Sequence, residues 1–135
     1  LRRAGGDAPR ADVARARLNF GRARAALGDH EAAEVSFAKA AELSDGPIGA
    51  EAQFRAGAAR RARGDAAGAA EAWLKLAILY SHEPWISDAL FEAGCAFEAT
   101  GAKDKAKKLF EEATTRFPTS EAAKKSRAKL GAGGG

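Results

Sequence analysis

The chain of 135 residues has one cysteine, no methionine, one tyrosine and only 7% aromatic residues. A single cysteine excludes an internal disulfide. With two histidines and no His-x-x-x-His, Glu-x-x-His or paired-cysteine motif, a structural zinc or di-iron site lacks ligands. No apolar run approaches the roughly 20 residues that a membrane-spanning helix needs. We therefore predict no metal, no cofactor and no membrane span within this chain.

The chain also lacks a strong excess of either charge, and it has no initiating methionine. It has 22 basic and 18 acidic residues, for a net charge of +4, which is too mixed to indicate a nucleic-acid partner unaided. Methionine is absent even at position 1, so we expect a processed or excised part of a longer protein. No signal peptide is visible, but a missing leader could have carried one, which leaves the compartment open.

Alanine, glutamate, lysine, arginine and leucine dominate, and these residues favour helices because they lose little side-chain entropy there. No alternating strand pattern occurs. Short turns between the helical segments favour antiparallel hairpins. Asp29 and Asp65 are predicted N-caps, and Gly101 suits the left-handed conformation that ends a helix. We predict seven helices, at 11–27, 30–43, 48–63, 66–80, 86–100, 103–117 and 120–130.

One pattern of small and aromatic residues occurs three times, 36 and then 37 residues apart. Each unit has a glycine within its first helix and another at the end of that helix, then an alanine and a large aromatic in its second helix. A period of this length indicates stacked hairpins, which usually form a binding surface. The repeated positions are Gly21, Gly28, Ala33 and Phe37, then Gly57, Gly64, Ala69 and Trp73, then Gly94, Gly101, Ala106 and Phe110, with Pro118 after the third unit.

The glycines within the first helices need a physical reason, because each costs about 1 kcal/mol relative to alanine. We predict that the missing side chain lets the second helix come close, with the repeated alanine facing the glycine. The aromatic residue lies one turn further along the same face. We expect it to fill the gap between neighbouring hairpins.

This pattern resembles the tetratricopeptide repeat, most clearly in residues 87–101 (SDALFEAGCAFEATG) followed by Ala106, Phe110, Ala113 and Pro118. The resemblance covers about residues 11–130. It implies an all-α fold, a right-handed superhelical solenoid of three hairpins (about 14–47, 50–83 and 87–120) with a capping helix at 120–130. Residues 1–10 are predicted to be a flexible lead, because Gly5, Gly6 and Pro9 oppose a stable helix, and 131–135 a disordered tail.

The chain departs from the family at several positions. Arg17, Arg24 and Arg60 stand where the family prefers large apolar or aromatic residues, so we expect their alkyl stems to cover apolar surface and the first two units to pack less firmly. Residues 45–52 and 116–123 are similar to a bacterial subtype found in periplasmic and outer-membrane-associated proteins. The resemblance implies that localisation, with the cytoplasm as the alternative.

By this resemblance, the first helices of the units line a groove that binds a protein or peptide partner. The chaperone-tail clamp of some members is absent, so a heat-shock chaperone tail is not expected. Arginine binds carboxylates through its planar fork, so a segment with an apolar residue and a carboxylate would fit. The alternative is that the aromatic side chains pack only against neighbouring helices. The predicted partner-binding residues are Leu18, Arg22, Phe54, Arg61, Phe91 and Glu98.

No constellation of residues supports catalysis. Cys95 is expected to fill space in the core or the groove. Trp85 follows Pro84 in a predicted loop, where it either covers the seam between the second and third units or anchors a partner. We therefore predict a non-enzymatic protein-interaction scaffold. The alternatives are a structural spacer that self-associates and, on the arginines of the first and third helices, an RNA-binding helical repeat.

Overall fold

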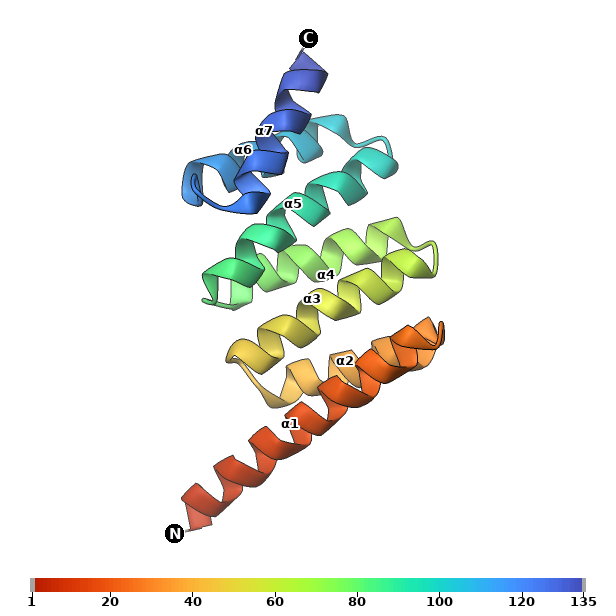
Figure 1. Ribbon diagram of the computed structural model, residues 1–135, viewed down its shortest axis with the longest axis vertical. Coiled ribbons are helices and arrows are strands. Elements are labelled where there is room, and N and C mark those ends of the chain that lie inside the picture. The colour runs from red at the N-terminus through yellow and green to blue at the C-terminus, as the bar shows by residue number, and fades with distance from the viewer. Residues whose placement is uncertain (1, 135) are drawn as a thin grey trace.

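The computed structural model describes the backbone of residues 2–134 and the side chains of residues 10–132, and within this part of the chain it contains helices and no strands. The helices stack in chain order along the long axis of the molecule (Figure 1). Each packs against the next one, and α1 contacts α3 as α3 contacts α5. This confirms the predicted all-α solenoid. The helices are α1 (Arg2–Ala26), α2 (His30–Leu43), α3 (Pro47–Ala62), α4 (Ala66–Leu79), α5 (Glu83–Ala99), α6 (Lys103–Arg116) and α7 (Glu121–Gly134).

Three helix boundaries differ from the prediction by more than one residue. Helix α1 begins at Arg2, within the predicted flexible lead, and α7 continues to Gly134, within the predicted disordered tail. A helix that is already nucleated gains one hydrogen bond for each added residue, which can outweigh the cost of glycine. Helix α5 begins at Glu83 and takes Pro84 into its first turn, where proline loses no intrahelical bond. Residues 1 and 135 lie outside the described part of the chain.

The turns within the three hairpins are built alike. Gly28, Gly64 and Gly101 have φ angles of +83°, +86° and +87°, so all three end their helices in the left-handed conformation that was predicted for Gly101. In the first two turns the next residue is a cap: Asp29 accepts from the Ala32 N–H at 3.2 Å, and Asp65 does the same for Gly68. The third turn has alanine at that position and no side-chain cap.

The glycine within each first helix faces the aromatic ring of its own hairpin. A methyl group on Gly21 would lie 2.6 Å from Cε1 of Phe37, and one on Gly57 would lie 2.6 Å from Nε1 of Trp73. Gly94 stands in the same relation to Phe110. The atoms nearest to an added methyl group thus belong to the aromatic ring, which the prediction places one turn away from the glycine. The ring lies within its own hairpin, because only a residue without Cβ leaves room for it.

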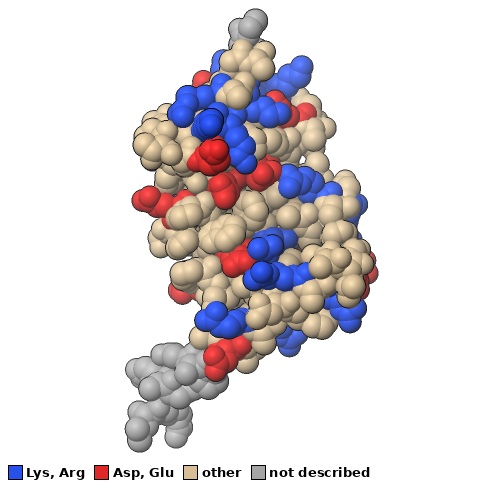
Figure 2. Space-filling view, viewed as in Figure 1, with Lys and Arg blue, Asp and Glu red and all other residues tan. Residues whose placement is uncertain are grey.

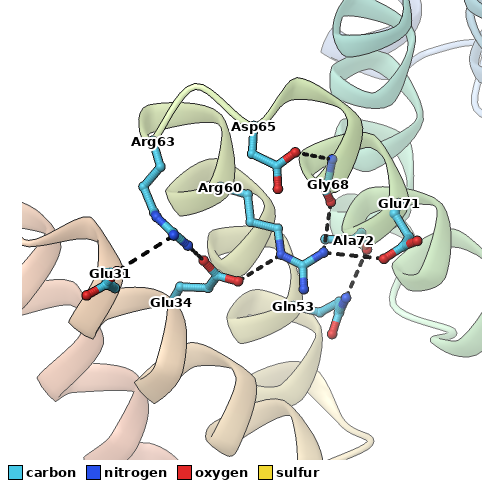
Figure 3. Close-up of polar contacts among 9 residues, drawn as sticks. All are labelled: Glu31, Glu34, Gln53, Arg60, Arg63, Asp65, Gly68, Glu71 and Ala72. Atoms are coloured by element: carbon cyan, nitrogen blue, oxygen red, sulfur yellow. Dashed lines mark hydrogen bonds and ion pairs between the residues drawn. The ribbon is translucent and has the colours of Figure 1, made fainter.

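A polar network joins the first hairpin to the second (Figure 3). The Arg60 side chain donates to Glu34 of α2 at 2.9 Å and to the Gly68 carbonyl of α4 at 3.0 Å, and its charge lies 3.5 Å from Glu71. Glu34 also pairs with Arg63. Arg60 thus links α2, α3 and α4 through its guanidinium group, whereas the sequence predicted a role for its alkyl stem.

Helix α7 occupies the place of a first helix in a fourth unit. Gly131 follows Gly94 by the same 37 residues that separate Gly94 from Gly57. Helix α7 packs on α5 and α6, as α5 packs on α3 and α4. A methyl group at Gly131 would meet nothing within 4 Å, because no described second helix supplies a ring there.

Candidate functional site

The outward side chains of α1, α3, α5 and α7 form one surface, here called the first-helix face. Five of the six predicted partner-binding residues lie at least partly exposed on these helices. Leu18 is only 4% exposed and packs in the core with Phe37 and Ala59. The prediction that Leu18 lines a groove is therefore wrong, because its side chain points inward to the α1–α2–α3 core.

Aromatic side chains meet between α3 and α5. The Phe54 ring lies 5.3 Å from the Trp85 ring and 5.8 Å from the Trp73 ring, centroid to centroid. Trp73 is fully buried and donates its indole N–H to the Phe54 carbonyl at 3.0 Å. Phe54 and Trp85 are only partly buried, so this pair leaves aromatic surface accessible above a fully buried ring.

Trp85 belongs to the first turn of α5, and the prediction that it lies in a connecting loop is wrong. The loop was predicted from Pro84, which the helix accommodates at its start. Trp85 packs against Phe54 across the seam between the second and third units, as one of the two predicted alternatives requires. Its accessible surface leaves the other alternative, a partner anchor, open.

Phe91 lies on the side of α5 that faces the end of the stack. Its ring is 5.7 Å from the Phe110 ring, and the Lys125 ammonium group lies 5.1 Å from its centroid. The Phe91 surface is therefore shared between the core of the third hairpin and a cation of α7. The rings of Phe54 and Phe91 have different neighbours, so these two predicted partner-binding residues form two separate aromatic surfaces.

Ion pairs across the units already engage the predicted charged residues. Arg61 of α3 donates to Glu92 of α5 at 2.6 Å, and its guanidinium lies 4.9 Å from the Trp73 ring centroid. Arg22 of α1 lies 3.9 Å from Glu51 of α3. A carboxylate ligand at either arginine would have to compete with the glutamate of the same chain.

The same positions pair again one unit further on, with the charges reversed. Arg61 lies four residues after Gly57, and its partner Glu92 lies two residues before Gly94. Glu98 lies four residues after Gly94, and its partner Lys129 lies two residues before Gly131, at 2.8 Å. Figure 2 shows the result as carboxylates gathered over α5, with cationic groups over α7 above and over α3 below.

Asp88 is a charged residue of this face that the prediction did not include. Asp88 is half-buried on α5. No Lys, Arg or His nitrogen of residues 10–132 lies within 4 Å of its carboxylate oxygens, so it forms no ion pair with these residues. Burial raises the pKa of its carboxyl group, Glu92 raises it further, and Lys125 lowers it. The repeat spacing could have revealed Asp88, because it lies six residues before Gly94 as Glu51 lies six before Gly57.

Cys95 borders a cavity of about 730 Å³ between α5, α6 and α7, which Glu98, Lys107, Phe110 and Lys129 also line. Burial raises the pKa of the Cys95 thiol, and the charge of Glu92 raises it further. A raised pKa keeps the thiol protonated at neutral pH, and the nucleophilic form of cysteine is the thiolate. The environment of Cys95 is thus that of a packing residue.

Within the described residues, no group of three or more His, Cys, Asp or Glu side chains is arranged to hold a metal ion. None of the described helices combines the length and apolar character needed to cross a membrane.

Residues 14–46 and residues 88–120 each match a family model described as a tetratricopeptide repeat. No curated protein matches the chain in sequence. Among solved structures, the N-terminal domain of stress-induced protein-1 (STI-1) from C. elegans is similar, with a TM-score of 0.76 and 24% identity over 88% of this chain and 95% of that one. This likeness shows the fold, and the two sequence matches fall on the first and third hairpins. The first and third hairpins therefore match the tetratricopeptide repeat in sequence, and the similarity in fold extends over 88% of the chain.

Proposed function

We propose that this protein is a protein-interaction module that binds a segment of a partner protein on its first-helix face, centred on Phe54 and Trp85. The observation that carries the proposal is the partly buried aromatic pair between α3 and α5. Aromatic side chains that are held in place and keep accessible surface are typical anchors at protein interfaces. The rings of Phe37, Trp73 and Phe110, by contrast, are buried and serve the hairpins.

Apolar contacts, more than carboxylate recognition, would supply the affinity. Arg22 and Arg61 already pair with Glu51 and Glu92, and Glu98 pairs with Lys129. A partner gains little by replacing an intramolecular ion pair with an equivalent one. Arg22, Arg61, Phe91 and Glu98 remain proposed contacts at the border of the site.

Selection of random twelve-residue peptides against the folded protein tests the proposal. We expect the selected peptides to lose at least about tenfold in affinity for the Trp85→Ala variant, because an aromatic anchor typically carries more than about 1 kcal/mol of the binding free energy. The matched control is Ile78→Ala, which removes an exposed apolar side chain from α4. Circular dichroism confirms that both variants fold. Equal binding to all three proteins would reject the first-helix face as the site.

Self-association is a second candidate, supported by one feature of α1. Val13 and Phe20 lie seven residues apart on α1 and are 45% and 49% exposed, and Leu27, in the turn directly after the helix, is 76% exposed. The spacing of Val13 and Phe20 places them on one side of the helix, where a second copy could pack. Light scattering over a concentration series measures this directly, and a constant monomer mass would reject it.

We also propose the bacterial periplasm or outer membrane as the location of this module. The support is the resemblance of residues 45–52 and 116–123 to repeats of that bacterial subtype. Fractionation of cells that produce the full-length protein tests the proposal, and recovery in the cytoplasm alone would reject it.

A further inference from the structure

We infer that the first-helix face has a cation-binding position at Asp88, which takes a lysine or arginine side chain of the bound partner segment. The inference rests on the proposed function and specifies the chemistry of the ligand. It reverses the charge predicted from the sequence, where Arg22 and Arg61 favoured a ligand carboxylate.

The repeat spacing shows which cation is missing at Asp88. In the second unit the equivalent carboxylate, Glu51, is paired with Arg22 of the preceding first helix at 3.9 Å and with Arg55 at 2.7 Å. Arg22 directly follows Gly21, so its equivalent for Asp88 is Ala58, which directly follows Gly57. Because α3 packs on α5 as α1 packs on α3, Asp88 stands in the place of Glu51 but faces Ala58 instead of an arginine, and it belongs to none of the ion pairs of residues 10–132.

Asp88 also lacks the second cation of Glu51, the one that comes from the same helix. Arg55, the second partner of Glu51, lies four residues after it on α3. The position four residues after Asp88 is Glu92, a second carboxylate, which is held by Arg61 at 2.6 Å. Both cations that neutralise Glu51 are therefore replaced at Asp88, one by a methyl group and one by a like charge.

Aromatic surface lies one helical turn from this position. Trp85 precedes Asp88 by three residues on α5, and Phe54 precedes Ala58 by four residues on α3, so each pair shares a helix face. The Phe54 and Trp85 rings are 5.3 Å apart. A lysine or arginine side chain can lay its apolar stem on these rings and direct its charge to the carboxylate. The position thus fits a cationic residue next to an apolar one.

Among the residues whose side chains are described, Lys125 of α7 is the cation that acts on Asp88. Its ammonium group lies over the Phe91 ring, 5.1 Å from the centroid, and it lowers the pKa of Asp88 by less than burial raises it but by more than Glu92 raises it. Burial and Glu92 both act to raise that pKa. Among residues 10–132 no cation lies within ion-pair distance of the Asp88 carboxylate, so a ligand cation would be its first ion-pair partner.

The test uses the random twelve-residue peptides selected against the intact protein. We expect lysine or arginine to be enriched at one position beside an apolar residue. We expect the enrichment to disappear in a selection against Asp88→Asn and to persist against Asp88→Glu, because a glutamate stands at the equivalent position 51. For the tightest peptide, replacing that lysine or arginine by norleucine should weaken binding to the wild type about threefold to tenfold and leave binding to Asp88→Asn unchanged.

A third variant, Ala58→Arg, supplies the missing cation within the chain. We expect it to raise the thermal stability of the protein and to remove the preference for a cationic peptide, because an arginine stands at the equivalent position 22 beside Glu51. Selected peptides without a cationic preference, or with an acidic one, would overturn the inference and leave the proposed function intact. If no peptide binds the wild type, both proposals fail.

Discussion

Asp88 carries a cost to stability that depends on pH. Its folded-state pKa is raised, first by burial and to a lesser extent by Glu92, although Lys125 lowers it by more than Glu92 raises it. The folded protein therefore holds this proton more tightly than the unfolded chain. The stability that Asp88 contributes is present below its unfolded pKa of about 3.9 and is lost as pH rises through the higher folded value.

We predict that Asp88→Asn is more stable than the wild type at pH 7, by roughly 0.2–1 kcal/mol, since solvent partly screens a half-exposed group. The gain should shrink as pH falls toward 4. Urea unfolding at several pH values measures the difference. Glu51→Gln is the matched control, because it removes the equivalent carboxylate together with its pairs to Arg22 and Arg55 and should lower stability at pH 7. A loss of stability in Asp88→Asn at pH 7 would contradict the assignment of Asp88 as an unpaired carboxylate.

The sequence predicts the roles of residues that recur in every unit although they are unfavourable in a helix. It does not predict the roles of residues whose contacts depend on how the hairpins stack. Three mid-helix glycines and three turn glycines were identified because each is unfavourable unless the structure requires it. The pairs Arg61–Glu92 and Glu98–Lys129 each join residues 31 positions apart on different units. Their meeting depends on how the hairpins stack, which single-residue preferences do not determine.

At the scale of the helix pair, contact between a glycine and a ring sets how closely the two helices pack. The Trp73 indole fills the space that a side chain at Gly57 would occupy, and it donates a hydrogen bond to the carbonyl of Phe54, which is on α3 like Gly57. Any side chain at position 57 must therefore displace the indole from α3. The alanine at the repeated position does not replace this contact, although Ala69 is fully buried.

We predict that Gly57→Ala lowers the free energy of unfolding by about 1–3 kcal/mol, because overpacking against a fully buried ring outweighs the gain in helix propensity. Chemical denaturation measures the change, and near-ultraviolet circular dichroism reports the displaced indole. Gly131→Ala is the matched control: it stands at the same repeat position within α7, where a methyl group meets nothing within 4 Å. That variant should be neutral or slightly stabilising. Equal effects of the two substitutions would show that the ring does not require the glycine.

Helices were predicted well where polar caps or glycines end them, and less well where the boundary depends on packing. The ends of α2 at Leu43 and the start of α4 at Ala66 agree with the prediction. Helix α5 starts earlier because Pro84 fits its first turn, and this placement brings Trp85 onto the helix. A loop was predicted there because of Pro84. Proline is compatible both with a loop and with the first turn of a helix.

At the scale of the whole molecule, the cooperativity of unfolding depends on the strength of the interfaces between neighbouring hairpins. The stability of such an array is approximately the sum of the hairpins and of the contacts between neighbours. Between the first two hairpins, Arg60 connects α2, α3 and α4 through Glu34, Gly68 and Glu71. Arg60 and Glu34 are 31% and 19% exposed, so their pair is shielded from solvent more than the other ion pairs of the surface.

We predict a coupling free energy of about 1 kcal/mol between Arg60 and Glu34 in a double-mutant cycle with Arg60→Met and Glu34→Gln. The control cycle is Arg116 and Glu112, an ion pair of 2.6 Å within the single helix α6, for which we expect about 0.3–0.5 kcal/mol. Because Arg60 acts between hairpins, its loss should also weaken hydrogen-exchange protection in α1 and α2 more than in α5 and α6. A uniform loss of protection along the chain would instead mean that the stack unfolds as one unit. The first-helix face would then be rigid across all its units, and a partner would meet a preformed surface rather than hairpins that adjust independently.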